Sequence, residues 1–351
     1  MDSRFRNLKV IYDGNDKTDM SATMNYKNNL IYSIPVVAAS YLGPSLIPNL
    51  DAAWDESKLP LSPDDLVQKI MGQPLRRAGR FIKLVCCGAL TCLKSVPPEE
   101  LKDKKIGIFL ATGLGNVDEI LPFITQVFKH EGGFPSPNQF ANSVSNAAAF
   151  FLAKISEIKG VILTVSQEEL SFESALWLAQ SYLERGEIDL ALVGGCDVFT
   201  PTIADYRERM DLKPDNSRSM RMGEGSSWIL IGNTSGKKIG NILSVTLDHN
   251  PKAELSNENI LSESEKIASQ FTGMQNKQKI ILPGFRLTDI DQSFFKDKGW
   301  KVEDYLPHCG IHPTATAYGL ARALLSGTSA FFVHCNYHAA GRRAMVAAVT
   351  E

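Results

Sequence analysis

Residues 160–198 read GVILTVSQEELSFESALWLAQSYLERGEIDLALVGGCDV, and this stretch decides the fold class of the chain. It begins with an apolar run at 160–165, which favours a buried strand. Residues 170–185 follow as a helix that is apolar on almost every side, and residues 189–193 form a second apolar strand. Continuous apolar strands that alternate with a helix are typical of an α/β protein whose sheet is covered on both faces.

The same alternation extends in both directions from this stretch. Apolar runs predict further strands, and amphipathic or apolar runs predict further helices. The predicted strands lie within 31–44 and at 106–112, 227–231, 239–248, 279–282, 329–334 and 344–349; the predicted helices lie at 62–71, 75–94, 262–270 and 314–325. We expect an N-terminal extension of uncertain structure at 1–31 and two intimately packed halves at 32–235 and 236–351, because no linker separates them.

Composition excludes several classes of function. The chain has 351 residues, with 37 Lys and Arg against 39 Asp and Glu, and this near-neutral balance argues against nucleic acid as the main partner. No apolar run approaches the roughly 20 residues that span a bilayer, and the N-terminus lacks an apolar signal core, so we expect a cytoplasmic protein. The six cysteines lack metal-ligand spacing and are expected to be reduced thiols, and no cofactor or metal motif is found. His334 and His338 are expected on a strand and a turn, which argues against a metal site.

Residues 160–198 resemble the β-ketoacyl synthase segment that reads strand, active-site turn, buried helix and a strand that closes on D-x-A-L-x-G-G. The resemblance covers roughly residues 32–351. It implies a thiolase-like fold, in which two similar α/β halves are layered α-β-α-β-α. Counting back from Ala175 and Leu176 places Glu169 where a ketosynthase has its nucleophilic cysteine. A carboxylate cannot replace a thiolate in thioester exchange.

Two interpretations of Glu169 remain open at the level of sequence. Residues 166–169 fit the S-x-x-E pattern, so Glu169 could complete a capping box at the start of the following helix. Alternatively, the position resembles that of chain-length factors, the partner subunits of type II polyketide ketosynthases, which typically have glutamine in place of the cysteine. Here a glutamate stands at that position, and Gln167 lies two residues earlier.

Two further segments resemble the ketosynthase loops that carry the catalytic histidines. PGFRLTDID at 283–291 has Pro283 where the first histidine is expected. PHCGIHPTATAYG at 307–319 has His312 at the second histidine, whereas Pro307 replaces a lysine. A proline ring offers no donor or acceptor to polarise a carbonyl group. The resemblance therefore implies a degenerate site that lacks the nucleophile and one of the two histidines.

Two other segments are expected to have structural roles. KPDNSRSMRMGEGS at 213–226 contains a Gly-Glu-Gly turn in which Glu224 is expected to brace a buried turn. NYHAAGRR at 336–343 keeps Asn336 and Gly341 of the ketosynthase turn, and Ala340 takes the position of its gating phenylalanine.

The resemblance implies a non-catalytic subunit, most like a chain-length factor, that pairs with an active ketosynthase as a heterodimer or a dimer of heterodimers. An acyl carrier protein is expected to be contacted mainly through that partner. The apolar helix at 170–185 is expected to be buried on every side near the interface. The alternatives are a malonyl-carrier-protein decarboxylase that initiates chains and a scaffold without a tunnel. Candidates for the tunnel or interface are Phe140, Phe150, Phe151, Gln167, Glu169, Phe172 and Ala340.

Overall fold

The computed structural model describes residues 33–129, 136–200, 221–249 and 256–351, except 272, 285, 288, 289, 339 and 340. The predictions made for residues 1–31, for the first part of the 213–226 loop and for Ala340 lie outside the described residues. Within the described part of the chain, no helix is both long enough and apolar enough to cross a membrane.

All ten described strands belong to one sheet with the order β3-β2-β4-β5-β1-β6-β10-β9-β7-β8. The strands are β1 (Ile34–Ser40), β2 (Ile106–Ala111), β3 (Ile162–Val165), β4 (Leu190–Asp197), β5 (Gly225–Gly232), β6 (Gly240–His249), β7 (Gln278–Pro283), β8 (Trp300–Val302), β9 (Ala330–His338) and β10 (Arg342–Thr350).

The strand order contains an internal repeat. From the middle of the sheet outward, β1-β5-β4-β2-β3 on one side matches β6-β10-β9-β7-β8 on the other. The pairings match as well, because the first two in each group are antiparallel and the last two are parallel. The antiparallel pair β1–β6 joins the two groups, with Ile34 opposite Ile242. This repeat confirms the predicted fold class of two similar α/β halves.

The helices complete five layers. They are α1 (Asp64–Met71), α2 (Arg80–Lys94), α3 (Pro98–Leu101), α4 (Val117–Lys129), α5 (Pro137–Ser143), α6 (Ala147–Ser156), α7 (Ser171–Glu184), α9 (Asn257–Ser269), α10 (Gln292–Asp297), α11 (Leu306–Cys309) and α12 (Ala315–Leu324), with short 3-10 helices η2 (Glu56–Lys58), η3 (Glu168–Leu170) and η4 (Met274–Asn276). The central layer is α7 and α12, each of which contacts strands of both halves. Helices α2 and α6 cover the outer face of the first half, and α9 and α10 cover that of the second.

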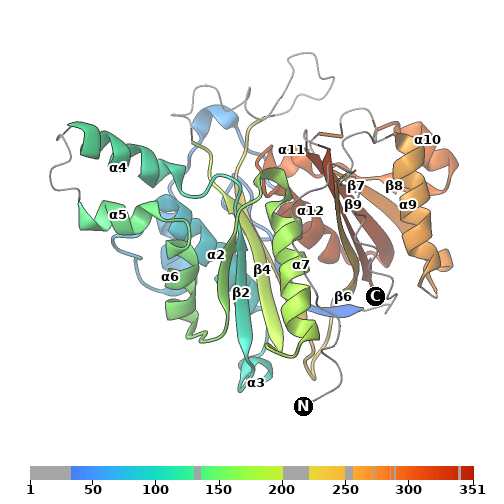
Figure 1. Ribbon diagram of the computed structural model, residues 1–351, viewed down its shortest axis with the longest axis horizontal. Helices are drawn as coiled ribbons and strands as arrows, with labels where there is room; N and C mark the ends of the chain where they lie inside the picture. Colours follow the sequence, from blue (N-terminus) through green and yellow to red (C-terminus); the bar gives the residue numbers. More distant parts are fainter. Residues whose placement is uncertain are drawn as a thin grey trace, which may run out of the picture. The chain divides into compact units, whose positions relative to one another are not determined.

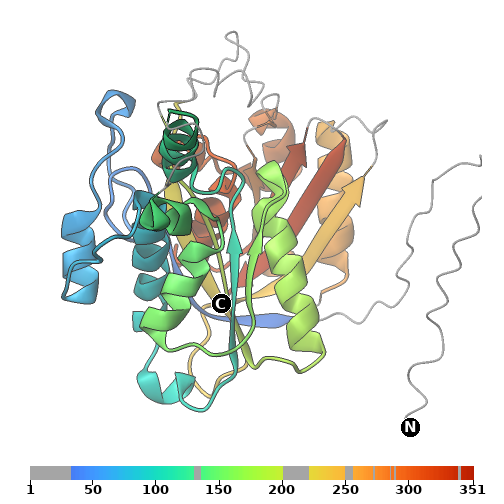
Figure 2. The same ribbon diagram turned by 60° about the vertical axis from the view of Figure 1, so that its left-hand side comes forward.

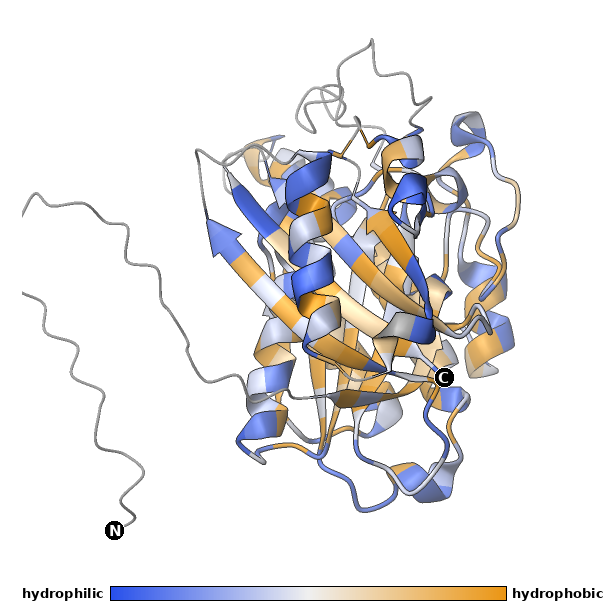
Figure 3. Cartoon of the chain, turned by 90° about the vertical axis from the view of Figure 1, so that its right-hand side faces the viewer, coloured by the Kyte–Doolittle hydropathy of each residue, from blue (hydrophilic) through white to orange (hydrophobic). Residues whose placement is uncertain are grey.

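The figures show this arrangement directly. In Figure 1, α7 lies between β4 and the strands of the second half, and the turned view in Figure 2 shows the two strand groups on either side of it. The colouring in Figure 3 is mostly orange or white along the strands, whereas blue is concentrated on helices and loops. The apolar strands are therefore enclosed between helices, as the continuous apolar runs predict.

Two glycines explain how β4 passes through the crowded core. A Cβ on Gly194 would lie 2.0 Å from the Trp228 ring, which is fully buried on β5. A Cβ on Gly195 would lie 2.7 Å from the Thr314 side chain at the start of α12. The Gly-Gly pair thus lets a strand approach an indole on one face and the central helix on the other.

The structure corrects three details of the sequence prediction. Helix α2 begins at Arg80 instead of residue 75, because Arg77 has a left-handed backbone (φ 63°) and Gly79 forms an extended N-cap. Helix α4 was not predicted, and it contains Pro122, a residue that argues against a helix interior. Strand β9 continues to His338, so this histidine lies on a strand and not in a turn.

Candidate functional site

The carboxyl ends of the parallel strands carry most of the residues singled out in the sequence. Strands β2, β3 and β4 are mutually parallel, as are β7, β8 and β9. The turn η3 follows β3 and holds Glu168 and Glu169, and Arg286 follows β7. His338 ends β9, and Arg342 begins β10. In open α/β sheets, ligand and catalytic sites gather at this edge.

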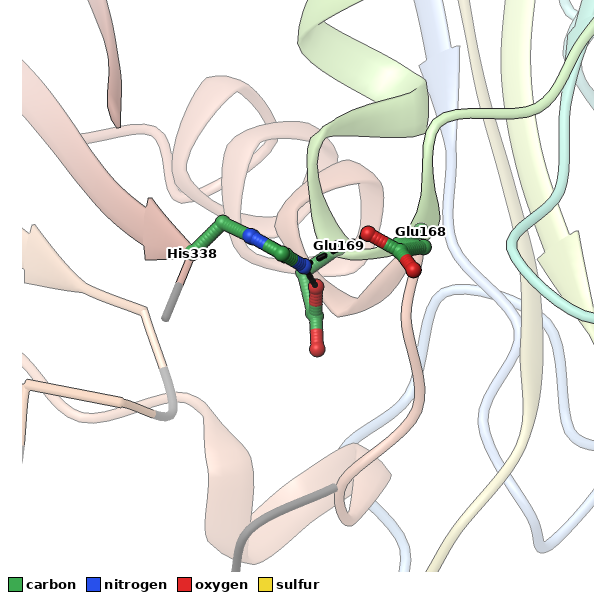
Figure 4. Close-up of side chains that lie close together, drawn as sticks. All are labelled: Glu168, Glu169 and His338. Carbon is green, nitrogen blue, oxygen red and sulfur yellow. Dashed lines mark ion pairs between the residues drawn. The ribbon is translucent and has the colours of Figure 1, made fainter. Parts of the chain in front are cut away.

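Glu169 is buried and ion-paired. Its side chain is 5 % exposed, and its Oε1 accepts a hydrogen bond of 2.7 Å from Arg286 Nη2. Its Oε2 lies 3.2 Å from His338 Nε2. Figure 4 shows both glutamates approaching the same end of the His338 ring, where dashed lines join the ring to Glu168 and to Glu169. The Glu169 carboxylate is thus held by an arginine and a histidine that lie more than a hundred residues away in the sequence.

The predicted capping box is wrong. Helix α7 begins at Ser171, its N-cap Leu170 makes no side-chain capping bond, and the Glu169 carboxylate turns away to Arg286. Ser171 organises the turn instead. Its Oγ accepts a 2.8 Å hydrogen bond from Gln167 N and lies 2.6 Å from Glu168 O, to which it donates. The cost of leaving the capping position is offset by the charge pair with the second half.

Glu168 extends the ion pairs to the surface. Its side chain is 61 % exposed, and its Oε2 lies 2.6 Å from Arg342 Nη2 and 2.5 Å from His338 Nε2. Its backbone has φ 53°, in the left-handed region that non-glycine residues seldom adopt. Glu168, Glu169, Arg286, His338 and Arg342 are called the ion cluster below.

Three members of the ion cluster could in principle hold a metal ion, since Glu168, Glu169 and His338 each offer a ligand atom within 4.8 Å of the others. A cation there would face Arg286 at one carboxylate and Arg342 at the other. Two guanidinium charges repel a metal ion, and each already pairs with one oxygen of a carboxylate that would bind it. We therefore assign no metal to the cluster.

A second layer of polar residues lies behind the ion cluster. Glu173, one helical turn after Glu169, is fully buried, and its Oε1 accepts hydrogen bonds of 2.9 Å from Asn336 Nδ2 and from Thr316 Oγ1. Asn336 Nδ2 also lies 2.8 Å from Glu169 O. Burial raises the pKa of the Glu173 carboxyl group from 4.5 to about 7. His334 Nδ1 lies 4.0 Å from Glu173 Oε1, and burial lowers the pKa of this imidazole to about 3.

The spacing of residues along β9 and along the segment that begins α7 explains why the two layers lie one behind the other. Residues 334, 336 and 338 alternate along β9 and so point to the same face of the sheet. Residues 169 and 173 are four apart and lie one above the other at the start of the helical segment. Each carboxylate therefore meets one histidine, and Asn336 bridges the two levels.

His312 is inside the core. It is 1 % exposed, its Nδ1 lies 3.5 Å from Thr314 Oγ1, and its Nε2 has no hydrogen-bond partner. Burial lowers the pKa of the ring to about 3, so the imidazole is neutral at physiological pH. Pro283 ends β7 opposite Cys335 of β9, and it offers no polar side-chain atom.

The residues expected to have structural roles lie in tight backbone positions. Glu224 is fully buried, forms a bidentate ion pair with Arg80 and accepts a 2.9 Å hydrogen bond from Phe199 N. Gly341 has φ 78°, in the turn that joins β9 to β10, and its N–H donates to His338 O. These contacts give a physical basis for the predicted bracing roles of Glu224 and Gly341, which stay predictions.

The thiol groups of the chain are all inaccessible. The six cysteines lie at 86, 87, 92, 196, 309 and 335, and all six are buried and unpaired. Burial raises the pKa of every one of them, to about 12 for Cys87 and Cys92. A nucleophilic thiolate requires a lowered pKa and access to substrate, and no cysteine of this chain has either property.

The tunnel candidates do not meet in one place. Phe140 and Phe150 are 57 % and 62 % exposed on α5 and α6, and the Phe151 ring packs edge-on against Phe150. Phe172 lies fully inside the central core, and Gln167 is exposed and accepts a hydrogen bond from Ser174 Oγ. Neither described cavity, of about 430 Å³ and about 920 Å³, is lined by any of these residues. Their role in a tunnel stays a prediction.

Sequence reasoning missed Arg286, Arg342, Glu173 and the contact of His338. The usable signal was the matched spacing, with carboxylates at 169 and 173 and histidines at 334 and 338. This spacing indicates a common face only if His334 and His338 lie on one strand, whereas the sequence predicts a turn at His338.

Comparisons with known proteins agree with this geometry. Residues 55–224 match the family described as Beta-ketoacyl synthase, N-terminal domain. A search of curated protein sequences found no significant match.

Three solved structures illustrate the structural similarity. The ishigamide ketosynthase/chain length factor superposes with a TM-score of 0.68 at 15 % identity, over 91 % of this chain and 99 % of that one. A β-ketoacyl synthase from Burkholderia phymatum gives 0.67 at 12 % identity, over the same shares of the two chains. The AntDE:AntF structure, a type II polyketide synthase acyl-carrier protein in complex with its ketosynthase, gives 0.67 at 11 % identity, over 91 % of this chain and 99 % of that one.

At these identities the structural matches establish the fold, and the family match places residues 55–224 in a named domain. The chain therefore has the fold of these ketosynthase structures, and its residues 55–224 match the β-ketoacyl synthase N-terminal domain.

Proposed function

We propose that the chain is a non-catalytic ketosynthase-like subunit, of the chain-length-factor kind, that works in a heterodimer with an active ketosynthase. The observation that carries this proposal is the buried, ion-paired Glu169 at the turn after β3, in a chain whose six cysteines are all buried. Carbon–carbon bond formation on acyl thioesters by this fold needs an accessible thiolate and groups that polarise the carbonyl. The described part of this chain offers neither, so the partner would perform the reaction.

The ion pairs of Glu169 also support a structural role for a glutamate at this position. A carboxylate that is 5 % exposed is stable only when it is paired, and Arg286 supplies the pairing charge while His338 lies 3.2 Å from the other oxygen. Arg286 follows strand β7 and His338 ends strand β9, so both residues come from the second half. The turn has thus become a structural link between the halves.

The first half also exposes a surface that suits a partner subunit. Strand β3 ends the sheet and pairs only with β2 among the described strands. Helices α6 and α7 both contact β3, and each of the three elements exposes a large apolar side chain: Phe150 (62 %), Ile162 (40 %) and Trp177 (48 %). An open strand edge beside exposed aromatic rings is a favourable surface for strand pairing and burial. Helix α7 is thus not buried on every side by this chain alone, and its burial near an interface stays a prediction.

The decarboxylase alternative is less well supported by the geometry. A glutamine at this position could donate a hydrogen bond from its amide, whereas the Glu169 carboxylate accepts one from Arg286. His312 is neutral and buried, and it has no second histidine at Pro283. Release of carbon dioxide from malonyl-carrier protein by the isolated chain, abolished in His312→Ala, would establish this alternative instead.

The test of the proposed function is co-expression with an intact ketosynthase encoded nearby and with its acyl carrier protein. We expect the two subunits to co-purify in equal amounts and the pair to elongate malonyl units. Substitution of Phe150 by Ala in this chain should then alter the product-length distribution, if the ring lines the shared tunnel. A stable homodimer that ignores the ketosynthase would contradict the proposal. A functional pair whose product length no tunnel substitution changes would support the scaffold interpretation.

A further inference from the structure

The outer part of the ion cluster contains an arginine and a histidine side chain in contact. Arg342 Nη2 lies 3.2 Å from His338 Nδ1 and 3.3 Å from His338 Nε2. Both groups are close to one oxygen, Glu168 Oε2, at 2.6 Å from Arg342 and 2.5 Å from His338. A single carboxylate oxygen therefore contacts both side chains, as an oxygen of a bound anion would.

Glu168 is much less firmly held than Glu169. The Glu168 side chain is 61 % exposed and that of Glu169 is 5 % exposed, although both contact the same histidine. The backbone of Glu168 is fixed, because its carbonyl oxygen accepts a 2.6 Å hydrogen bond from Ser171 Oγ. Rotation of the side chain alone would thus free the Arg342–His338 pair, with no change in the turn.

The remaining contacts would keep the pair in place. His338 would still lie 3.2 Å from Glu169 Oε2, and Arg286 would still bind Glu169 Oε1. The left-handed backbone of Glu168 directs its carboxylate to this position at a conformational cost, and such strain concentrates at functional sites.

We propose that Arg342 and His338 form a binding site for a small carboxylate ligand and that Glu168 occupies this site as a tethered, displaceable substitute. The site would take a carboxylate-bearing small molecule from solvent, beside the buried Glu169. The proposal concerns this chain alone and goes beyond its proposed function, so it holds or fails independently of any partner subunit.

Acetate is the probe, added to the full-length chain at constant ionic strength with chloride as the balancing anion. The His338 ring resonances report binding, and they are assigned by their loss in His338→Gln. We expect a saturable shift in the unmodified chain, affinity about tenfold higher in Glu168→Gln because the tethered competitor is removed, and no saturable shift in Arg342→Gln.

Glu187→Gln is the matched control, because Glu187 also forms an exposed ion pair, with Arg185, away from the cluster. Its acetate affinity should equal that of the unmodified chain. Equal affinities in Glu168→Gln and the unmodified chain would overturn the proposal. A saturable shift that survives in Arg342→Gln, or a shift that never saturates in any variant, would also overturn it. Glu168 and Arg342 both lie at the surface, so we expect both variants to fold. If one variant fails to fold, the acetate affinity of the other still tests the proposal.

Discussion

At the scale of single residues, the decisive feature is the difference between two adjacent glutamates. Glu169 is buried between Arg286 and His338, whereas Glu168 reaches Arg342 at the surface. Burial determines how much each charged side chain contributes to the stability of the folded chain. Removing one member of a buried pair leaves an uncompensated charge in the core, but removing one member of an exposed pair leaves a charge that water can solvate.

We therefore predict that Glu169→Ala lowers the free energy of unfolding by about 3 kcal/mol and that Glu168→Ala lowers it by less than about 1 kcal/mol. Urea unfolding at neutral pH measures both values. The two variants are matched controls for each other, since they remove the same side chain from neighbouring positions. Equal losses in both variants would contradict the assignment of Glu169 as a buried structural link.

Glu173 gives a second prediction at this scale, one that depends on pH. Its pKa is raised to about 7 by burial, so the folded chain holds a proton that the unfolded chain, with an ordinary pKa, has lost. The stabilisation from this proton is complete below the unfolded pKa and is lost as pH rises through about 7.

Relative to Glu173→Gln, the unmodified chain should lose about 1 kcal/mol of unfolding free energy between pH 6 and pH 8. Glutamine imitates the neutral form and can still accept hydrogen bonds from Asn336 and Thr316. Urea unfolding of both proteins at the two pH values measures the difference. If the difference in unfolding free energy between the two proteins is the same at pH 6 and at pH 8, Glu173 does not titrate between these pH values.

The ion cluster itself could not be read from the sequence. Arg286 lies 117 residues from Glu169, and Arg342 lies 174 residues from Glu168. The matched spacing of carboxylates at 169 and 173 and histidines at 334 and 338 is visible, but it does not show that the two segments meet. The substitution at 169 was visible because a motif surrounds it, but its ion partners depend on how the two halves pack.

At the scale of helices and strands, the surface formed by β3, α6 and α7 is the feature with the clearest consequence. Its exposed apolar residues, Phe150, Ile162 and Trp177, come from three elements in mutual contact. A side chain that is already half exposed can be changed with little effect on the fold, so its role in binding can be tested separately from stability.

Trp177→Lys and Ile162→Lys are expected to leave the melting temperature almost unchanged and to weaken association with a ketosynthase partner at least tenfold, because large aromatic and apolar side chains dominate such interfaces. The control is Leu247→Lys on β6, where the side chain is also 38 % exposed but lies in the other half. Size-exclusion chromatography of the mixed subunits measures association. Equal weakening by Leu247→Lys would place the interface elsewhere.

Prediction of the elements succeeded where apolar periodicity was strong. The strands at β2, β4 and β7 are continuous apolar runs, and their positions were predicted to within a few residues. Helix α4 was missed, because Pro122 lies inside it and none of its side chains is fully buried to impose a core pattern. Its shape in this chain depends on its contact with α5 and not on a buried face.

At the scale of the whole molecule, the repeated strand order places a matching group of strands on each side of the central helices. The buried β strands and the central helices α7 and α12 form a core shared by both halves. Glu169 and His312 are themselves buried, and Pro283 ends the buried strand β7. The fold class could be predicted from the β-α-β stretch, since its apolar pattern requires a covered sheet. The halves' boundary at 235/236, between β5 and β6, stays a proposal.

The central claim is that this chain cannot accept an acyl group itself. The most direct test incubates the isolated full-length chain with an acylated carrier protein and measures its intact mass. We predict no added mass, either for the unmodified chain or for Glu169→Cys, because Pro283 still lacks the group that would polarise the thioester. An intact ketosynthase in the same reaction should gain the acyl mass. A stoichiometric acyl adduct on the unmodified chain would contradict the account.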